Sequence, residues 1–291
     1  MATQMTNSAN SEITSYLKES EKTSLEVRSR NLRRMILEYG FKGGEGVHLG
    51  GALSCIDILN VLYSEILCVD LQRLNVSDRD IFILSKGHAC LALYVVLGFF
   101  GYYDLELLNT FMKNGGKFGG HPELGTVPGI EATTGSLGHG LSVGTGISLA
   151  NKMDGNSGMC FVLLGDGECN EGSVWEASLS AAQYKLDNLV AIIDSNKMQA
   201  LTPMSDREGM KVEPLSDKFT SFGWETREID GHDLGGLSRV LKSVPFTNDK
   251  PSAVIAHTIK GKGVSFMENV PKWHVRPMTN DELSLALQEQ E

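Results

Sequence analysis

The chain has 291 residues, of which 41% are hydrophobic and 21% charged, and its 36 acidic and 26 basic side chains give a net charge of −10. A chain of this length and composition buries a sizeable core, so neither a disordered nor a fibrous protein is expected. The acidic balance argues against a general binder of nucleic acid or of anionic membranes. Four arginines at helical spacing among apolar residues predict a solvated helix face rather than a basic binding patch: Arg28, Arg30, Arg33 and Arg34.

No targeting or membrane segment is predicted. Residues 1–20 are polar and lack the apolar stretch of a secretory signal. The longest apolar run, Leu91 to Phe100, is half of the roughly 20 residues that a membrane-spanning helix needs. The five cysteines form an odd set without a C-x-x-C pair, which favours reduced thiols over disulfides or a zinc site. We therefore expect a cytoplasmic protein with a polar leader over residues 1–20 and one domain over residues 21–291.

The apolar patterns, taken in chain order, predict alternating helices and strands. A first helix runs from about residue 21 to Gly40 and is followed by a glycine-rich stretch over residues 43–51. Short apolar runs predict buried strands at 81–84, 160–164, 189–194 and 253–258, with a weaker strand at 226–229. Helical patterns lie at 55–66, 90–100, 105–113, 141–152, 174–185 and 234–241. This alternation predicts an α/β fold in which a doubly wound, mostly parallel sheet is flanked by helices.

The strongest chemical signal lies where two of these strands end. Asp166 stands between two glycines directly after one strand, and Asn196 follows the next strand. Because parallel strands end at the same edge of a sheet, Asp166 and Asn196 are expected to offer two oxygen ligands to one hard cation, with the Met198 carbonyl as a third. Gly167 lets a phosphate approach backbone N–H groups. The donor set therefore predicts Mg²⁺ that holds a diphosphate.

Three other patterns have more ordinary interpretations. The run Lys260 to Gly263 follows a strand and is interpreted either as a phosphate contact or as a solvated basic turn. The glycines around residue 140 imitate a dinucleotide fingerprint, but no strand precedes them, so Gly140, Gly144 and Ser148 predict a close-packed helix face. Ser173 and Glu176 have the spacing of a capping box for the helix that follows Asp166.

Five further segments match the motifs of one enzyme family. They are Gly46-Val47-His48-Leu49-Gly50-Gly51, Ser85-Lys86-Gly87-His88-Ala89, Gly120-His121-Pro122-Glu123, Thr133-Thr134-Gly135-Ser136-Leu137-Gly138-His139-Gly140 and Trp273-His274. Together with the Asp166 and Asn196 elements they resemble transketolase, a thiamine-diphosphate enzyme, from about residue 25 to residue 280. The sequence departs from the usual family pattern at Val47, Leu49, His139 and Val275.

The resemblance implies a thiamine-diphosphate-binding fold with thiamine diphosphate and Mg²⁺ as cofactors. It implies that His88 and His274 contact both cofactor and substrate, and that His48 and His121 bind substrate hydroxyls. Imidazoles suit these roles because they donate or accept protons near neutral pH.

The resemblance also implies roles for backbone and carboxylate groups. The implied cofactor-binding residues outside the histidines are Gly135, Ser136, Leu137, Gly167 and Asn196, and the implied metal ligands are Asp166, Asn196 and Met198. Glu171 resembles an acidic residue of the network that links paired active sites.

The resemblance finally implies a reaction and a partner. Transketolases continue through a pyrimidine-binding domain and a C-terminal domain, so this chain resembles the N-terminal subunit of a split enzyme whose C-terminal partner subunit carries those domains, in an α₂β₂ assembly. The implied reaction transfers a two-carbon ketol unit from a ketose (phosphate) donor to an aldose acceptor. Two alternatives remain: a deoxyxylulose-phosphate-synthase-like carboligase with an acyl or pyruvate donor, and a non-catalytic regulatory subunit of the same fold.

Overall fold

The computed structural model describes residues 24–71, 76, 78–200, 202–204 and 209–291. The predicted polar leader, residues 1–20, lies outside the described residues.

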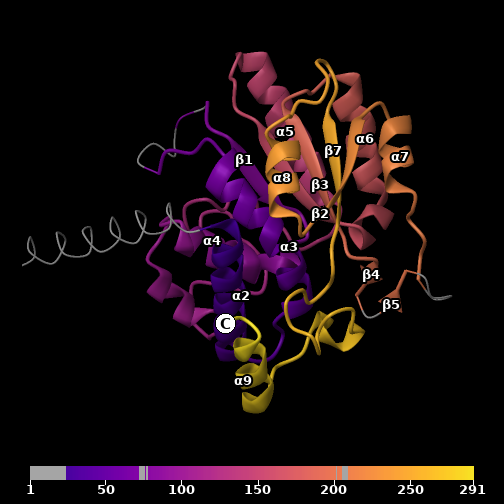
Figure 1. Cartoon of the computed structure of the whole chain (residues 1–291). Helices are drawn as coiled ribbons and strands as arrows, with labels where there is room; N and C mark the ends of the chain where they lie inside the picture. Colours follow the sequence, from indigo (N-terminus) through magenta and orange to yellow (C-terminus); the bar gives the residue numbers. More distant parts are fainter. Residues whose placement is uncertain (1–23, 72–75, 77, 201, 205–208) are drawn as a thin grey trace, which may run out of the picture.

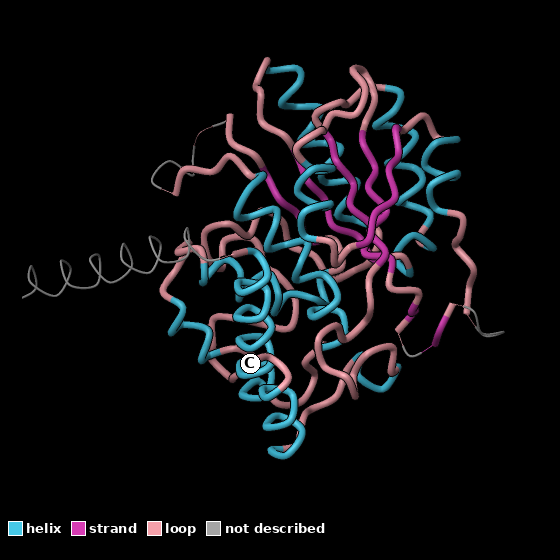
Figure 2. The backbone as a smooth tube through the Cα atoms, in the orientation of Figure 1, coloured by secondary structure: helices cyan, strands magenta, loops and turns pink. Residues whose placement is uncertain are grey.

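A five-stranded, fully parallel sheet forms the centre of the molecule (Figures 1 and 2). Its strands, in spatial order, are β1 (Ile81–Leu84), β2 (Cys160–Gly165), β3 (Leu189–Ser195), β7 (Ser252–His257) and β6 (Glu225–Asp230). A short antiparallel ribbon of β4 (Met198–Gln199) and β5 (Thr202–Pro203) follows β3. All five predicted strands are confirmed within two residues at each end, and so is the parallel α/β fold class.

Helices cover both faces of this sheet. One face shares a core with α2 (Leu25–Gly43), α3 (Leu49–Val61), α4 (Cys90–Phe99) and α8 (Leu234–Leu241). The other face packs against α5 (His139–Asp154), α6 (Gly172–Gln183) and α7 (Leu215–Ser221). Along β2, side chains alternate between the two cores, Phe161 and Leu163 facing one and Val162 and Leu164 the other. This two-sided burial explains the continuous apolar strand sequences.

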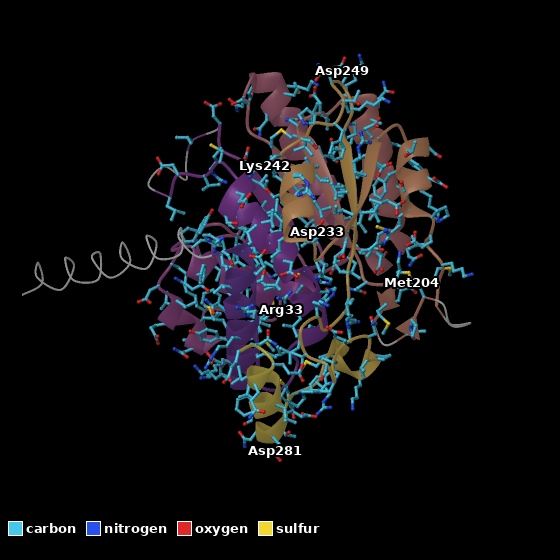
Figure 3. All side chains as sticks on the ribbon, in the orientation of Figure 1. Arg33, Met204, Asp233, Lys242, Asp249 and Asp281 are labelled. Atoms are coloured by element: carbon cyan, nitrogen blue, oxygen red, sulfur yellow. The ribbon has the colours of Figure 1, made fainter. Side chains whose placement is uncertain are left out.

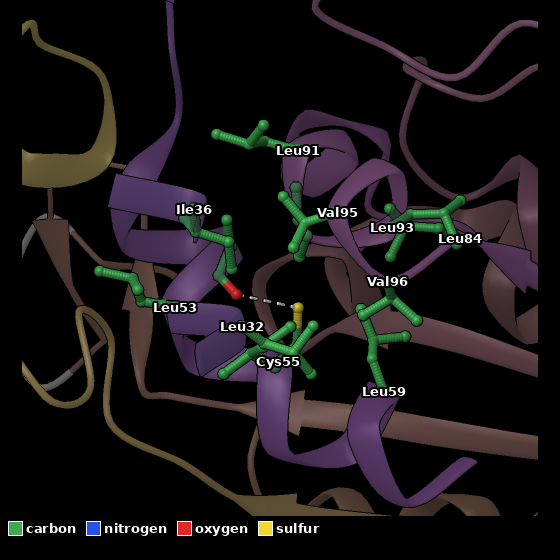
Figure 4. Close-up of a cluster of buried hydrophobic side chains, with 14 of the residues drawn as sticks. Leu32, Ile36, Leu53, Cys55, Leu59, Leu84, Leu91, Leu93, Val95 and Val96 are labelled. Carbon is green, nitrogen blue, oxygen red and sulfur yellow. Dashed lines mark hydrogen bonds between the residues drawn. The ribbon is translucent and has the colours of Figure 1, made fainter. Parts of the chain in front are cut away.

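The larger core lies on the side of α2, α3 and α4. Figure 4 shows Leu32 and Ile36 from α2 beside Leu53 from α3 and Val95 from α4, and all four are completely buried. The remaining elements are the C-terminal helix α9 (Asn280–Gln288), the 3₁₀ turns Gly87–Ala89, Leu105–Thr110, Gly167–Asn170 and Pro271–His274, and a π-turn at Leu62–Ile66.

One helical stretch among the described residues, Leu49–Ile66, is long and apolar enough to span a membrane, but 78% of it is buried inside the protein. It is therefore the core helix α3 together with the π-helical turn that follows it. The five cysteines are free thiols, and all but Cys68 are buried.

Several local expectations were wrong. Arg28 and Arg33 are buried, while only Arg30 and Arg34 lie on the solvated face of α2. Arg33 is buried because it pairs with the buried carboxylate of Asp57, which the helical spacing alone did not indicate.

Two helix ends also differ from the expectation. No capping box forms at Ser173, because its hydroxyl donates to Gly138 O at 3.0 Å and Glu171 occupies the N-cap. The helix α3 begins at Leu49, inside the predicted glycine-rich loop. Gly50 is required there because a Cβ would lie 2.9 Å from the carbonyl oxygen of Trp273.

The close packing expected around Gly140 and Gly144 is confirmed on α5. A Cβ on Gly140 would lie 2.4 Å from the Ser85 side chain, and a Cβ on Gly144 would lie 2.5 Å from Val162 Cγ2. The first contact brings the start of α5 directly against the loop that follows β1, and the second packs the helix against β2.

We expect Gly140→Ala to lower the free energy of unfolding by about 1–3 kcal/mol, since the added methyl group would also lie 2.7 Å from the Cα of Ser85. The matched control is Gly146→Ala on the same helix, where a Cβ meets nothing within 4 Å and helix propensity adds up to about 1 kcal/mol. Urea denaturation of the purified chain measures both, and equal effects of the two substitutions would contradict the packing.

Candidate functional site

The predicted site residues converge at the carboxyl edge of the sheet. Four neighbouring strands, β1, β2, β3 and β7, are followed there by the segments that begin at Ser85, Asp166, Asn196 and Thr258. This edge is where parallel α/β sheets bind ligands. Gly87 permits a close approach of two of the loops, because a Cβ on it would lie 2.7 Å from the amide nitrogen of Gly135.

A cavity of about 490 Å³ opens between these loops. It is lined by Gly51, Lys86, His88, Gly135, Leu137, Gly165, Asp166, Gly167, Glu168, Asn170, Asn196, Met198, Gln199, Ala200, Met210, Lys260 and His274. Eight of these residues were predicted from the sequence to hold the cofactor or the metal: His88, Gly135, Leu137, Asp166, Gly167, Asn196, Met198 and His274. Ser136 does not line the cavity and is exposed, as is Glu171 at the start of α6.

Asp166 and Asn196 face the same end of the cavity. The Asp166 carboxylate accepts from the backbone of Gly167 at 2.8 Å and of Lys197 at 2.6 Å. Asn196 Oδ1 accepts from the Met198 amide at 3.1 Å. Burial, reinforced by the charge of Asp194, raises the pKa of Asp166 to about 7. Asp166 makes no ion pair with a cationic side chain in the part of the chain that the structure describes.

Four histidines form a second wall of the site. The ring of His48 has its centroid 5.0 Å from that of His274, 5.6 Å from that of His88 and 6.4 Å from that of His121. Three segments far apart in sequence therefore place imidazoles around His48. His48 and His121 are absent from the cavity lining, and His48 is half-buried while His121 is exposed.

Burial keeps three of these rings neutral. It lowers the pKa of His48, lowers that of His88 well below its ordinary value, and with the nearby charge of Lys260 lowers the pKa of His274 to about 3. A neutral imidazole offers one donor and one acceptor nitrogen. At neutral pH these rings therefore serve hydrogen bonding to hydroxyls rather than charge pairing.

A buried ion pair lies under the cavity. Lys86 Nζ pairs with Asp194 Oδ2 and donates to Gly51 O at 3.0 Å, and both side chains are at most 1% exposed. Ser54 donates to the same carboxylate oxygen at 2.6 Å, and Thr258 donates to the other oxygen. Burial alone would raise the pKa of Asp194, but Lys86 and these hydroxyls hold it below its ordinary value.

A second buried carboxylate, Glu168, connects three ligand-facing loops. Its Oε1 accepts from the Ser85 hydroxyl and from the Gly138 amide at 2.8 Å, and its Oε2 accepts from the Gly165 amide at 3.1 Å. The Ser85 hydroxyl in turn accepts from the Gly140 amide at 3.1 Å. These bonds fix the loops after β1 and β2 against the start of α5.

Lys260 belongs to the site. It is 2% exposed, and its Nζ lies 2.8 Å from Ala200 O and 3.1 Å from His274 Nδ1. Burial, with the charge of Lys86, lowers the pKa of Lys260 to about 8. Of the two interpretations given for the run 260–263, the solvated turn fits only Lys262, which is half-buried beside Glu268.

Comparison with known proteins identifies the family to which this chain is similar. Residues 31–290 match the family model described as "Transketolase, thiamine diphosphate binding domain". The chain belongs to the transketolase family. Its thiamine-diphosphate-binding fold is thereby confirmed.

Relatives of this transketolase chain include short proteins of matching length. It is 43% identical over 266 residues to a subunit of the apulose-4-phosphate transketolase of Phocaeicola vulgatus, covering 91% of this chain and 93% of that protein. It is 36% identical to a subunit of the 6-deoxy-6-sulfo-D-fructose transketolase of a Clostridium species, covering 93% of this chain and 98% of that protein.

Solved structures share the fold over part of their length. The transketolase from Leishmania mexicana superposes with a TM-score of 0.84 at 28% identity, over 91% of this chain and 41% of that chain. The transketolase from Campylobacter jejuni superposes with a TM-score of 0.83 at 30% identity, over 92% of this chain and 43% of that chain. The chain thus spans less than half the length of these solved transketolases.

Sequence reasoning assigned no role to three residues of this transketolase site: Lys86, Asp194 and Glu168. The signal for the first two was present, since a lysine and an aspartate each stand where a buried apolar strand ends. Neither is expected to be buried without a partner, which could have suggested a pair. Glu168 lies in a turn and carries no comparable signal.

We expect Asp194→Asn to lower the free energy of unfolding by about 3–5 kcal/mol, because it leaves the Lys86 ammonium buried without its counter-charge. Lys86→Met leaves the Asp194 carboxylate buried without its counter-charge and should lower the free energy of unfolding by a similar amount. The double variant should lose clearly less than the sum of the two, and guanidinium denaturation of all four proteins measures this coupling. Additive losses would contradict a direct pair.

Proposed function

We propose that this chain is the cofactor-binding subunit of a two-component transketolase, which transfers a two-carbon ketol unit from a ketose donor to an aldose acceptor. The single observation that carries the proposal is the convergence, at one sheet edge, of the Asp166–Asn196 oxygens and the cluster of His48, His88, His121 and His274. The relatives named as subunits, which this chain covers almost completely, support the two-component form.

The residues present fit Mg²⁺ and a diphosphate. The Asp166 carboxylate is 1% exposed, its pKa is raised to about 7, and it has no cationic side chain as partner among the described residues. A divalent cation would relieve that cost, and Asp166, Asn196 and the Met198 carbonyl are the oxygen donors for it. Lys86 and Lys260 add positive charge beside the place where a diphosphate would lie.

The proposed mechanism divides the work between cofactor and chain. Thiamine diphosphate supplies, when bound, a thiazolium carbon that stabilises the carbanion of the transferred unit. The backbone from Gly135 to Leu137 would hold the aminopyrimidine side of the cofactor. The neutral rings of His88 and His274 would hold protons at the donor hydroxyls near the reacting carbon, while His48 and His121, beside them but outside the cavity lining, would orient the sugar.

A partner subunit completes the site in this proposal. Solved transketolases are more than twice the length that this chain matches, which supports a second chain that carries the pyrimidine-binding and C-terminal domains. A heterotetramer of two copies of each chain would give two such sites, with Glu171 at the surface in the network that links them. We place this assembly in the cytoplasm, which the five free thiols support.

The proposed substrates are sugars, with a phosphorylated ketose as donor. Among the relatives, one protein is named for apulose-4-phosphate and another for 6-deoxy-6-sulfo-D-fructose, both sugars with an anionic group. Among the described residues that line the cavity, the lysines are Lys86 and Lys260, and both already have partners, Lys86 in Asp194 and Lys260 in His274 and Ala200. The anionic end of the sugar would therefore be held by the partner subunit.

Native mass spectrometry tests the assembly. A complex purified with Mg²⁺ from its source, through a tag on this chain, is expected to be a heterotetramer that carries two thiamine diphosphates. Transfer from a ketose phosphate, without decarboxylation of pyruvate, would then separate a transketolase from a carboligase. A homo-oligomer without cofactor would contradict the proposal and favour the alternative of a non-catalytic regulatory subunit.

We expect Asp166→Ala to abolish Mg²⁺-dependent binding of thiamine diphosphate by this complex, because it removes the charged ligand of the proposed metal site. The control is Asp249→Asn, at the opposite, amino-terminal edge of the sheet, where an exposed side chain pairs weakly with Lys185 (Figure 3). Isothermal titration calorimetry measures both, and undiminished binding by the Asp166 variant would refute the metal assignment.

A further inference from the structure

A buried polar chain leads from the core to the site through three residues on separate elements. Arg33 on α2 and Asp57 on α3 form an ion pair with side chains 10% and 4% exposed (Figure 3 labels Arg33). His232 follows β6, and its Nδ1 lies 2.8 Å from the same carboxylate oxygen of Asp57. Its side chain is 12% exposed.

The hydrogen bonds of His232 determine where its proton is. The backbone amide of Ile259 donates to His232 Nε2 at 2.9 Å, so that nitrogen carries no proton. The ring proton is therefore on Nδ1, where it is donated to Asp57. Only this neutral tautomer makes both bonds.

The amide that His232 accepts belongs to the segment that carries Lys260. Within this segment the amides of Thr258 and Gly261 donate to backbone carbonyls, those of Ser195 at 3.1 Å and Gly50 at 3.0 Å. The Ile259 amide is held by a side chain instead. It lies one residue before Lys260, whose ammonium donates to His274 Nδ1 at 3.1 Å.

We propose that His232 is a positioning residue for the site: Asp57 fixes its tautomer, and its Nε2 holds the Ile259 amide and thereby keeps Lys260 against His274. An ammonium group has only donors, so Lys260 requires the unprotonated Nδ1 of His274 and leaves the ring proton on Nε2. His232 thus selects the tautomer of a histidine on the cavity wall without touching it. The catalytic meaning of this tautomer rests on the proposed function, whereas the hydrogen-bond chain does not.

Two substitutions separate the bonds of His232. The amide of Asn reaches the position of the ring Nδ1, so His232→Asn keeps a donor for Asp57 and has no acceptor for Ile259. The longer Gln places its oxygen near the position of Nε2, so His232→Gln keeps the acceptor and gives up the bond to Asp57. The pair therefore tests the Ile259 bond at constant polarity.

The readout is the tautomer of His274, observed at neutral pH by long-range ¹H–¹⁵N correlation spectra of the full chain labelled in its histidines. Wild type and His232→Gln are expected to share the Nε2–H pattern at His274. In His232→Asn the two ring nitrogens of His274 should shift toward each other, because a mixture of tautomers replaces a single one. Thermal unfolding confirms that each variant is folded.

Identical His274 signals in all three proteins would overturn the proposal. It would equally fail, with no variant needed, if His232 of the wild type carried its proton on Nε2. Both results are independent of cofactor, so a chain that failed to bind thiamine diphosphate would overturn the proposed function and leave this measurement intact.

Discussion

The site depends on one carboxylate that has no access to water. Asp194 is the last residue but one of the central strand β3 and is completely buried, yet it bonds to Lys86 from the loop after β1, to Ser54 from α3 and to Thr258 after β7. A charge in that position is tolerated only with its counter-charge and hydrogen bonds in place. The requirement fixes the relative positions of the segments that carry these groups. The cavity is consequently part of the core construction and not an addition to it.

The strands and the Asp166–Asn196 pair could be predicted from the sequence, for a physical reason. The strands are buried on both faces, so their apolar runs stand out, and turn residues mark where they end. Because parallel strands share an edge, placing Asp166 and Asn196 at strand ends was enough to bring them together. The histidines are different: nothing in their spacing places His48 beside His274, and only the family resemblance grouped them before the structure did.

What sequence reasoning missed are partners across long sequence distances. Arg33 has the spacing of a surface arginine, and only the position of Asp57 on the next helix makes it a buried one. Lys260 and Lys262 look alike in the sequence, but Lys262 is only half-buried, whereas the packing of its segment against Gly50 and His274 buries Lys260. In each case the deciding contact is between separate elements, which local patterns do not encode.

The strand pairings have a consequence for how the cavity comes into being. Ile81 pairs with Cys160, and Val190 pairs with Ser252. Each of these parallel pairings closes a long loop of chain, so conformational entropy is lost before the strand hydrogen bonds form. Lys260 and His274 come later still in the sequence. A nascent chain that ended before Ser252 would hold Asp166, Asn196 and His88 without the strand and lysine that complete their surroundings. The cavity is therefore complete only once residues 252–274 have been synthesised, and a ligand that needs its whole lining cannot stabilise a shorter nascent chain.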